Sequence, residues 1–83
     1  MTIKLPSGFE VLCVSDLAYE YMLAEIQFDD EQIALVSIEH GIDKAEIEMF
    51  TTFLNKGFTP KFRLNDFNEA IHQAVKLLRQ YQT

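Results

Sequence analysis

Few side chains in this sequence have the type and spacing that catalysis requires. Glu46 and Glu48 lie two residues apart in a segment that alternates polar and apolar residues, so both carboxylates are expected on one water-facing side of a strand. Paired carboxylates act as acid and base when their surroundings separate their pKa values, and this alternation predicts no such burial. His40 precedes Gly41 at an expected turn, without the Cys or Asp spacing of a metal or nucleophile site. We expect no enzyme, with no catalytic, cofactor-binding or metal-binding residue.

The single cysteine and the second histidine fit structural positions. Cys13 cannot form an internal disulfide, and in the apolar segment 11–14 we expect it to act as a buried small hydrophobic residue. His72 shares one helix face with Asn68 and Lys76, opposite an apolar stripe, which predicts an exposed side chain.

The charge of the chain is unevenly distributed. The 83 residues carry a net charge of −6. Residues 1–55 contain two bases against eleven acids, a balance of −9, whereas residues 56–83 contain five bases against two acids, a balance of +3. Nucleic acids are bound through cationic surface, so the acidic region opposes binding to DNA or RNA. A basic protein partner is the better expectation.

A short basic and aromatic stretch leaves one alternative open. Alternating aromatic and cationic side chains can stack on and neutralise a single-stranded nucleic acid. A hairpin or loop whose aromatic rings pack inward explains the same pattern, and we favour it. The residues concerned are Phe53, Lys56, Phe58, Lys61, Phe62 and Arg63.

Segments rich in alternating, β-branched and aromatic residues, separated by turn residues, predict a series of strands. A polar turn that begins at Asp29 and Asp30 separates two of these segments, as in a β-hairpin. The middle of the chain is therefore expected to form an antiparallel meander of four to five strands. The expected strands cover residues 3–5, 9–15, 19–28, 33–39 and 45–50.

The last part of the chain changes to steps of three and four residues between apolar positions, which predicts an amphipathic helix over 64–81. Asp66 is the expected N-cap, with Glu69 three residues later, and Lys76 and Arg79 suit the negative C-terminal end of the helix.

A helix with one apolar stripe must bury it, and the sheet offers the matching surface. We therefore expect an α+β fold in which the C-terminal helix packs on one face of the sheet. The whole chain, 1–83, forms one domain, with 1–63 mainly β and 64–81 helical.

The expected register sorts side chains between the two faces of the sheet. An even-length turn after Phe28 aligns Ile26 with Ile33 or Leu35, and a second even-length turn precedes Ile47. The acids then gather on one face, where a cationic partner would relieve their repulsion, although a solvated outer face explains them as well. One face would carry Ala34, Val36, Ile38, Ile47 and Met49, and the other Ser37, Glu39, Glu46 and Glu48.

Several segments together are similar to a known group of proteins. The pattern comprises LPSGFE at 5–10, EIQFDD at 25–30, IALVSIE at 33–39, EIEMF at 46–50 and LNDF at 64–67 before the helix. In this layout the chain resembles the small immunity proteins of bacterial polymorphic toxin systems, of the contact-dependent inhibition and Maf kinds. The resemblance covers most of the chain without an invariant catalytic motif.

The resemblance implies an intracellular inhibitor that binds the C-terminal toxic domain of a cognate effector, often a basic nuclease, and covers its active site or substrate groove. On this hypothesis the acidic surface imitates the polyanion that the nuclease binds. The partner-binding residues would be Glu25, Glu39, Glu46 and Glu48, with the tyrosines Tyr19 and Tyr21.

Two other classes stay open. A small adaptor or regulatory subunit could dimerise through a strand edge or the helix, and an enzyme would rest on Glu46, Glu48 or His40 alone. Dimerisation is compatible with the immunity hypothesis too. Because the sequence has no run of about 20 apolar residues and residues 1–6 lack the apolar stretch of a signal peptide, we expect a cytoplasmic protein without a membrane partner.

Overall fold

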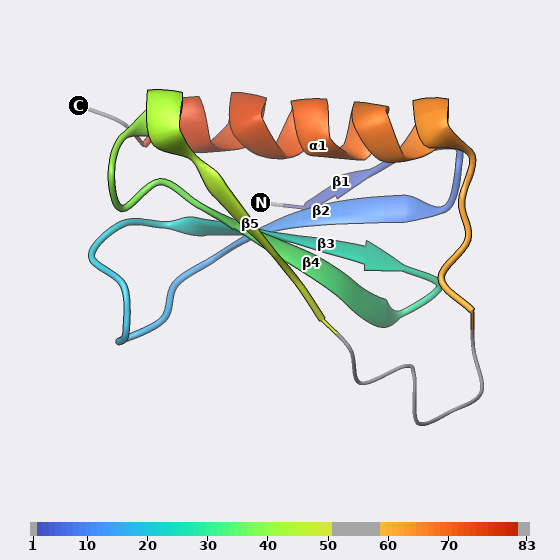
Figure 1. The fold of residues 1–83 in the computed structure, drawn as a ribbon, viewed down its shortest axis with the longest axis horizontal. Coiled ribbons are helices and arrows are strands. Elements are labelled where there is room, and N and C mark those ends of the chain that lie inside the picture. Colours follow the sequence, from blue (N-terminus) through green and yellow to red (C-terminus); the bar gives the residue numbers. More distant parts are fainter. Residues whose placement is uncertain (1, 51–58, 82–83) are drawn as a thin grey trace.

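A five-stranded sheet and one helix make up the part of the chain that the computed structural model describes, residues 2–50 and 59–81 (Figure 1). All neighbouring strands are antiparallel and follow one another in chain order. The α+β fold, the meander and the C-terminal helix on one face are confirmed. The elements are β1 (Thr2–Lys4), β2 (Phe9–Val14), β3 (Leu23–Phe28), β4 (Glu31–Ser37), the short 3-10 helix η1 (Ile42–Lys44), β5 (Glu46–Met49) and α1 (Leu64–Arg79).

The hairpin between β3 and β4 closes through a two-residue turn. Asp29 and Asp30 have φ values of 51° and 65°, and Phe28 pairs with Glu31 across them. Two successive positive φ angles define the type I′ turn, whose twist matches that of the flanking strands. Short acidic side chains tolerate this left-handed backbone better than most residues do.

The predicted partner of Ile26 is wrong because β4 contains a bulge. The register shifts between Ile26 and Gln27, so Ile26 pairs with Ala34 while Gln27 pairs with Gln32, and Ile33 is the extra residue. In a regular strand Ile33 and Ala34 would point to opposite faces. Here both are fully buried in the same core beneath α1.

The predicted grouping of the residues within β4 and β5 is otherwise confirmed, whereas Ile38 and Glu39 lie beyond the end of β4 at Ser37. Ala34 pairs with Met49 and Val36 with Ile47, so these side chains share the face toward α1. On the opposite face Ser37 lies across from Glu46. We call the face toward α1 the helix face and the opposite one the open face.

The core lies between the helix face and α1. The apolar stripe of α1 buries Ala70, Ala74, Leu77 and Leu78 against β2 and β3. At one end of this interface the ring of Phe9 lies 4.9 Å from that of Phe28, 5.0 Å from that of Phe62 and 5.8 Å from that of Phe67. Edge-on aromatic pairs of this kind contribute about 0.5–1.5 kcal/mol beyond their buried area.

Phe62 therefore packs inward, as the loop interpretation of the basic stretch expects. Thr59 to Arg63 form an irregular connection into α1. Phe53, Lys56 and Phe58 lie outside the described residues.

The start of α1 differs from the prediction. Arg63 is the N-cap, with an extended backbone and no side-chain cap, and the helix begins at Leu64. Asp66 is therefore not the N-cap; it lies in the first turn, where its negative charge suits the helix dipole. Lys76 and Arg79 lie in the last turn as expected. His72, Asn68 and Lys76 are all exposed, which confirms their predicted face.

Cys13 lies where β2 approaches the end of α1. It is half-buried and packs against the core, so it is less enclosed than expected. A side-chain hydrogen bond between Cys13 and Tyr81, followed by their charge interaction and a small effect of burial, raises the pKa of Tyr81 above its ordinary value of 10.0. Cys13 thus connects the sheet to the residues just after α1.

Candidate functional site

The open face of the sheet is the candidate functional surface because α1 covers the other face. Register places Leu12, Glu25, Leu35 and Glu48 side by side across four strands. Two carboxylates therefore alternate with two leucines in one row. The neighbouring row begins with Lys4 opposite Glu10 and continues through Gln27 to Gln32.

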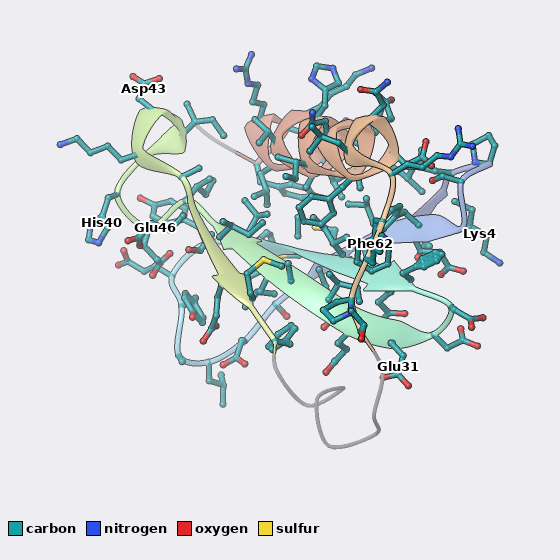
Figure 2. The ribbon with its side chains drawn as sticks, turned by 45° about the vertical axis from the view of Figure 1, so that its right-hand side comes forward. Lys4, Glu31, His40, Asp43, Glu46 and Phe62 are labelled. Carbon is teal, nitrogen blue, oxygen red and sulfur yellow. The ribbon has the colours of Figure 1, made fainter. Side chains whose placement is uncertain are left out.

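This surface lies on a strongly acidic sheet. Among the described strand residues, five are acids, namely Glu10, Glu25, Glu31, Glu46 and Glu48, and one is basic, Lys4. Lys4 lies on the edge strand β1, on the far side of the molecule from Glu46 (Figure 2). The acids on β3 and β5 therefore have no cationic neighbour on the described strands.

A hollow of about 460 Å³ is built on this face. Its apolar lining consists of Val14, Leu23, Leu35 and Phe50. Its polar lining consists of Ser15, Asp16, Tyr19, Glu25, Gln32 and Glu48. The hollow thus combines an apolar surface with three carboxylates, which suits a long cationic side chain whose stem is apolar and whose head is charged.

The loop of residues 15–22 closes one side of the hollow and corrects a prediction. The strand predicted over 19–28 begins only at Leu23, because the preceding residues turn away from the sheet. The side chain of Asp16 accepts a hydrogen bond from the backbone N–H of Ala18 (2.8 Å). The backbone carbonyl of Asp16 accepts one from the backbone N–H of Tyr19 (3.0 Å). This local turn ends any extended pairing there.

Glu39 holds the far end of the same loop. Its two carboxylate oxygens accept hydrogen bonds from the backbone N–H groups of Glu20 (2.8 Å) and Tyr21 (3.1 Å). Hydrogen bonds to a charged acceptor are stronger than neutral ones. The structure therefore gives Glu39 a positioning role, which keeps the loop beside the hollow.

Glu25 is bound by two neighbouring amides. It is half-buried in β3, and its carboxylate accepts hydrogen bonds from the amides of Gln27 and Gln32, the latter at 3.0 Å. These two amides hold the carboxylate in place within its row of leucines. A fixed carboxylate meets a partner at a lower entropic cost than a freely rotating one.

The six predicted partner-binding residues divide into two groups. Tyr19, Glu25 and Glu48 line the hollow together. Outside its lining, Glu46 is exposed at the start of β5, Tyr21 is 43% exposed on the loop, and Glu39 is bound to that loop.

Sequence reasoning missed Asp16, Leu23 and Leu35 as parts of this surface. The side chain of an aspartate can accept a hydrogen bond from the backbone two residues later, which makes aspartate a turn signal. Asp16 forms such a bond with Ala18. Leu23 is only 1% exposed although it faces away from α1. The alternation within β3, combined with the pairing to β2, could have placed it on the open face.

Within residues 2–50 and 59–81, no group of three or more His, Cys, Asp or Glu side chains is placed to hold a metal ion. Over the same residues, no helix has the length and apolar character to cross a membrane.

Comparison with known proteins adds no relative. None of the protein-family models, curated proteins or solved structures compared with this chain matches it. The class that fold and surface define is thus a small α+β protein with one acidic, hollowed sheet face.

Proposed function

We propose that this chain is an immunity protein that binds and neutralises a cognate bacterial toxin domain, a basic nuclease. It acts in the cytoplasm without chemistry of its own, covering the toxin's active site or substrate groove. One observation carries the proposal: the open face holds an acidic hollow, in which Asp16, Glu25 and Glu48 surround an apolar lining.

The chemistry of this hollow favours an arginine or lysine side chain of the partner. Leu35 lies between Glu25 and Glu48 in the cross-strand row, so the apolar stem would pack on the leucine while the cationic head meets the two carboxylates. A nuclease places such cations along its substrate groove to bind phosphate. An acidic face would compete for the same cations, and its field would accelerate encounter at low salt.

The shape of the face suits a protein partner better than a small substrate. The hollow lies on an open sheet, beside exposed side chains such as Tyr21 and Leu17, which is 106% exposed. Aromatic and apolar side chains around charged groups are typical of protein interfaces.

Protection from the product of the adjacent gene tests the proposal. That product should be toxic when expressed alone, and this protein should restore growth and co-purify with it. Glu48→Lys should reduce protection, because it places a cation in the hollow and repels a basic partner. Asp43→Lys on η1 changes the net charge equally, outside the lining of the hollow, and should protect like the wild type.

A harmless neighbour would refute the immunity function. Equal protection by Glu48→Lys and the wild type would refute the role of the hollow. Binding that weakens steeply as salt rises would agree with the electrostatic mechanism.

A non-catalytic adaptor or regulatory subunit is the second candidate. Ile47 and Met49 are 43% and 50% exposed on the helix face, which offers a second apolar contact surface. A stable dimer or a complex with a non-toxic neighbouring protein would favour this candidate.

A further inference from the structure

The outer edge of β5 has backbone groups directed away from the sheet. β5 is the terminal strand of the sheet, and in residues 2–50 and 59–81 no further strand pairs with it. The N–H of Phe50 donates to the carbonyl of Ile33 on β4 at 2.9 Å. Because inward and outward groups alternate in an antiparallel ladder, Glu48 and Glu46 also bond toward β4, whereas Ile47 and Met49 direct their N–H and C=O groups outward.

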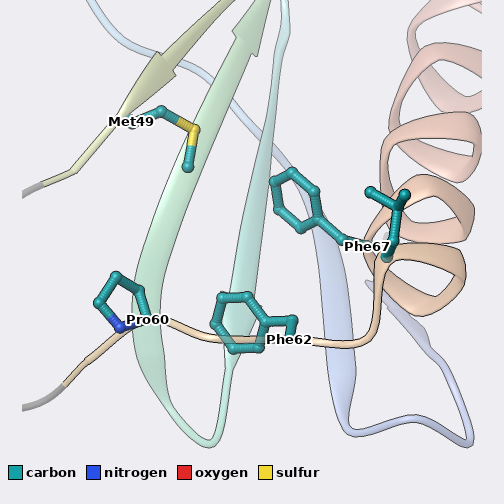
Figure 3. A pocket seen from close by; sticks show the side chains of 5 residues that line it. Met49, Pro60, Phe62 and Phe67 are labelled. Carbon is teal, nitrogen blue, oxygen red and sulfur yellow. The ribbon is translucent and has the colours of Figure 1, made fainter.

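The two sides of this edge differ in chemistry. On the helix face lie Ile47 and Met49, which stay 43% and 50% exposed because α1 packs mainly over β2 and β3. Beside Met49 is an apolar pocket of about 230 Å³, also lined by Pro60, Phe62, Leu64 and Phe67 (Figure 3). On the open face the same strand presents Glu46 and Glu48.

The opposite edge of the sheet is protected by comparison. β1 has three residues and β5 four, so the two edges differ chiefly in charge: Lys4 lies exposed on β1, whereas β5 carries Glu46 and Glu48. Short edge strands with a lysine resist pairing with another chain. Acidic side chains on β5 instead leave pairing open to a strand of opposite charge.

A second copy of this chain fits the edge poorly. In the two antiparallel registers about a two-fold axis that overlap the β5 strands most, Glu48 faces Glu48 of the second copy or Glu46 faces its Glu48. Like charges directly opposite each other destabilise a strand pair. A strand with cations at these positions would turn the same contacts into attraction.

We infer that β5 accepts a strand from a partner protein, in which cationic side chains alternate with apolar ones. The cations face Glu46 and Glu48, the apolar side chains extend the surface of Ile47 and Met49, and the backbone bonds to the outward groups of these two residues. The inference rests on the proposed function only in identifying the partner as a basic toxin domain.

A synthetic strand tests the edge without the toxin. The probe is a nine-residue peptide of alternating Lys and Val, titrated into the full chain while backbone amide shifts are recorded. We expect saturable shifts centred on Ile47 and Met49. A peptide with the same residues in one Lys block and one Val block should bind at least about fivefold more weakly, because it cannot satisfy both faces.

Backbone and charge variants locate the contact. Ile47→Pro removes an outward N–H while leaving the bonds to β4, and should weaken binding about fivefold. Thr2→Pro is the matched change on β1. The backbone N–H of Leu5 donates to the carbonyl of Phe9 on β2, so by alternation the N–H of Thr2 points away from the sheet. This variant should leave peptide binding unchanged. The double variant Glu46→Lys, Glu48→Lys should bind a peptide of alternating Glu and Val more tightly than the Lys and Val peptide. It tests the contact without placing a proline in β5.

The other results would overturn the inference. The inference fails if the block peptide binds as tightly as the alternating one, or if the amide shifts centre on the hollow around Glu25 instead of β5. It also fails if the charge-reversed variant keeps its preference for the Lys and Val peptide, or if the free protein dimerises through β5. Failure here is distinguishable from failure of the proposed function. If the protein protects against the product of the adjacent gene but the Ile47 and Met49 amide shifts do not change in the complex, only the strand-pairing inference is contradicted. If the protein binds the peptide but the product of the adjacent gene is harmless, only the proposed immunity function is contradicted.

Discussion

The two faces of the sheet are made by the same strands but are completed by different parts of the chain. The helix face is completed by α1, whose apolar stripe buries residues such as Ile26 and Ala34. The open face is completed only in part, by the loop of residues 15–22, which leaves a hollow beside Leu23. The comparison shows that the main core and the acidic hollow lie on opposite sides of one small sheet.

The difference follows from the amount of apolar surface available. Among the described residues one α-helix, α1, supplies the apolar surface that covers the sheet, and a helix packed on one face leaves the opposite face uncovered. The face that remains open carries most of the strand carboxylates because alternation places Glu10, Glu25, Glu46 and Glu48 there. The uncovered part of the protein is thereby also its most acidic part.

The largest expected difference between residues concerns the helix face itself. Ile26→Ala should lower the free energy of unfolding by about 2–5 kcal/mol, because it leaves a cavity under α1. Ile47→Ala, on the same face but 43% exposed, should cost about 1 kcal/mol or less. Urea unfolding of both variants checks this. Similar losses would show that β5 is covered as fully as β3.

A second variant tests whether the loop gives the open face a small core of its own. Leu23→Ala should cost about 2–3 kcal/mol although Leu23 faces away from α1, since it is almost fully buried. Glu39→Ala should release the loop and reduce the additional cost of Leu23→Ala. A double-mutant cycle on urea unfolding should give a coupling of about 0.5 kcal/mol or more. Additive losses would show that Glu39 does not maintain the cover over Leu23.

The smallest expected effect lies at the border of the helix face, where Cys13 meets Tyr81. Cys13→Ala should lower the pKa of Tyr81 toward 10.0, because it removes the hydrogen bond that raises it. Since the folded state favours the protonated phenol, its contribution to stability is complete below pH 10.0 and is lost as the pH rises through the raised value.

The chemical shift of the Tyr81 ring carbon that bears the hydroxyl, followed against pH, measures this effect. Cys13→Ser keeps a hydrogen-bonding group and should retain part of the shift. An unchanged pKa of Tyr81 in the Cys13→Ala variant would show that Cys13 does not bond to Tyr81.

Much of the fold could be predicted because its signals are local. The steps between apolar residues from Leu64 onward specify a helix face wherever that helix lies. Asp29 and Asp30 signal a turn through their own backbone preferences, and their turn formed as expected. The N-cap was misplaced at Asp66 because the extended backbone at Arg63 has no side-chain signal.

The candidate site was predictable only in part. Alternation placed Glu46 and Glu48 on one face, and the structure confirms that placement. The role of Glu39 in holding the loop depends on contacts with Glu20 and Tyr21, which lie 18 to 19 residues away in sequence. No local pattern reports such a contact, so Glu39 was assigned to the partner surface alone.

The sequence by itself determined the class of fold, the acidic character of the strands and the apolar stripe of the helix, because each depends on residue types at short spacing. Tertiary structure alone decided where β4 bulges, and with it the side of the sheet that Ile33 joins and the partner of Ile26. The bulge at Ile33 reverses the strand's alternation, and its position depends on how Ile33 and Ala34 pack together beneath α1. The hollow and the outer edge of β5 likewise depend on contacts between distant segments, because strand pairing and the loop of residues 15–22 bring their residues together.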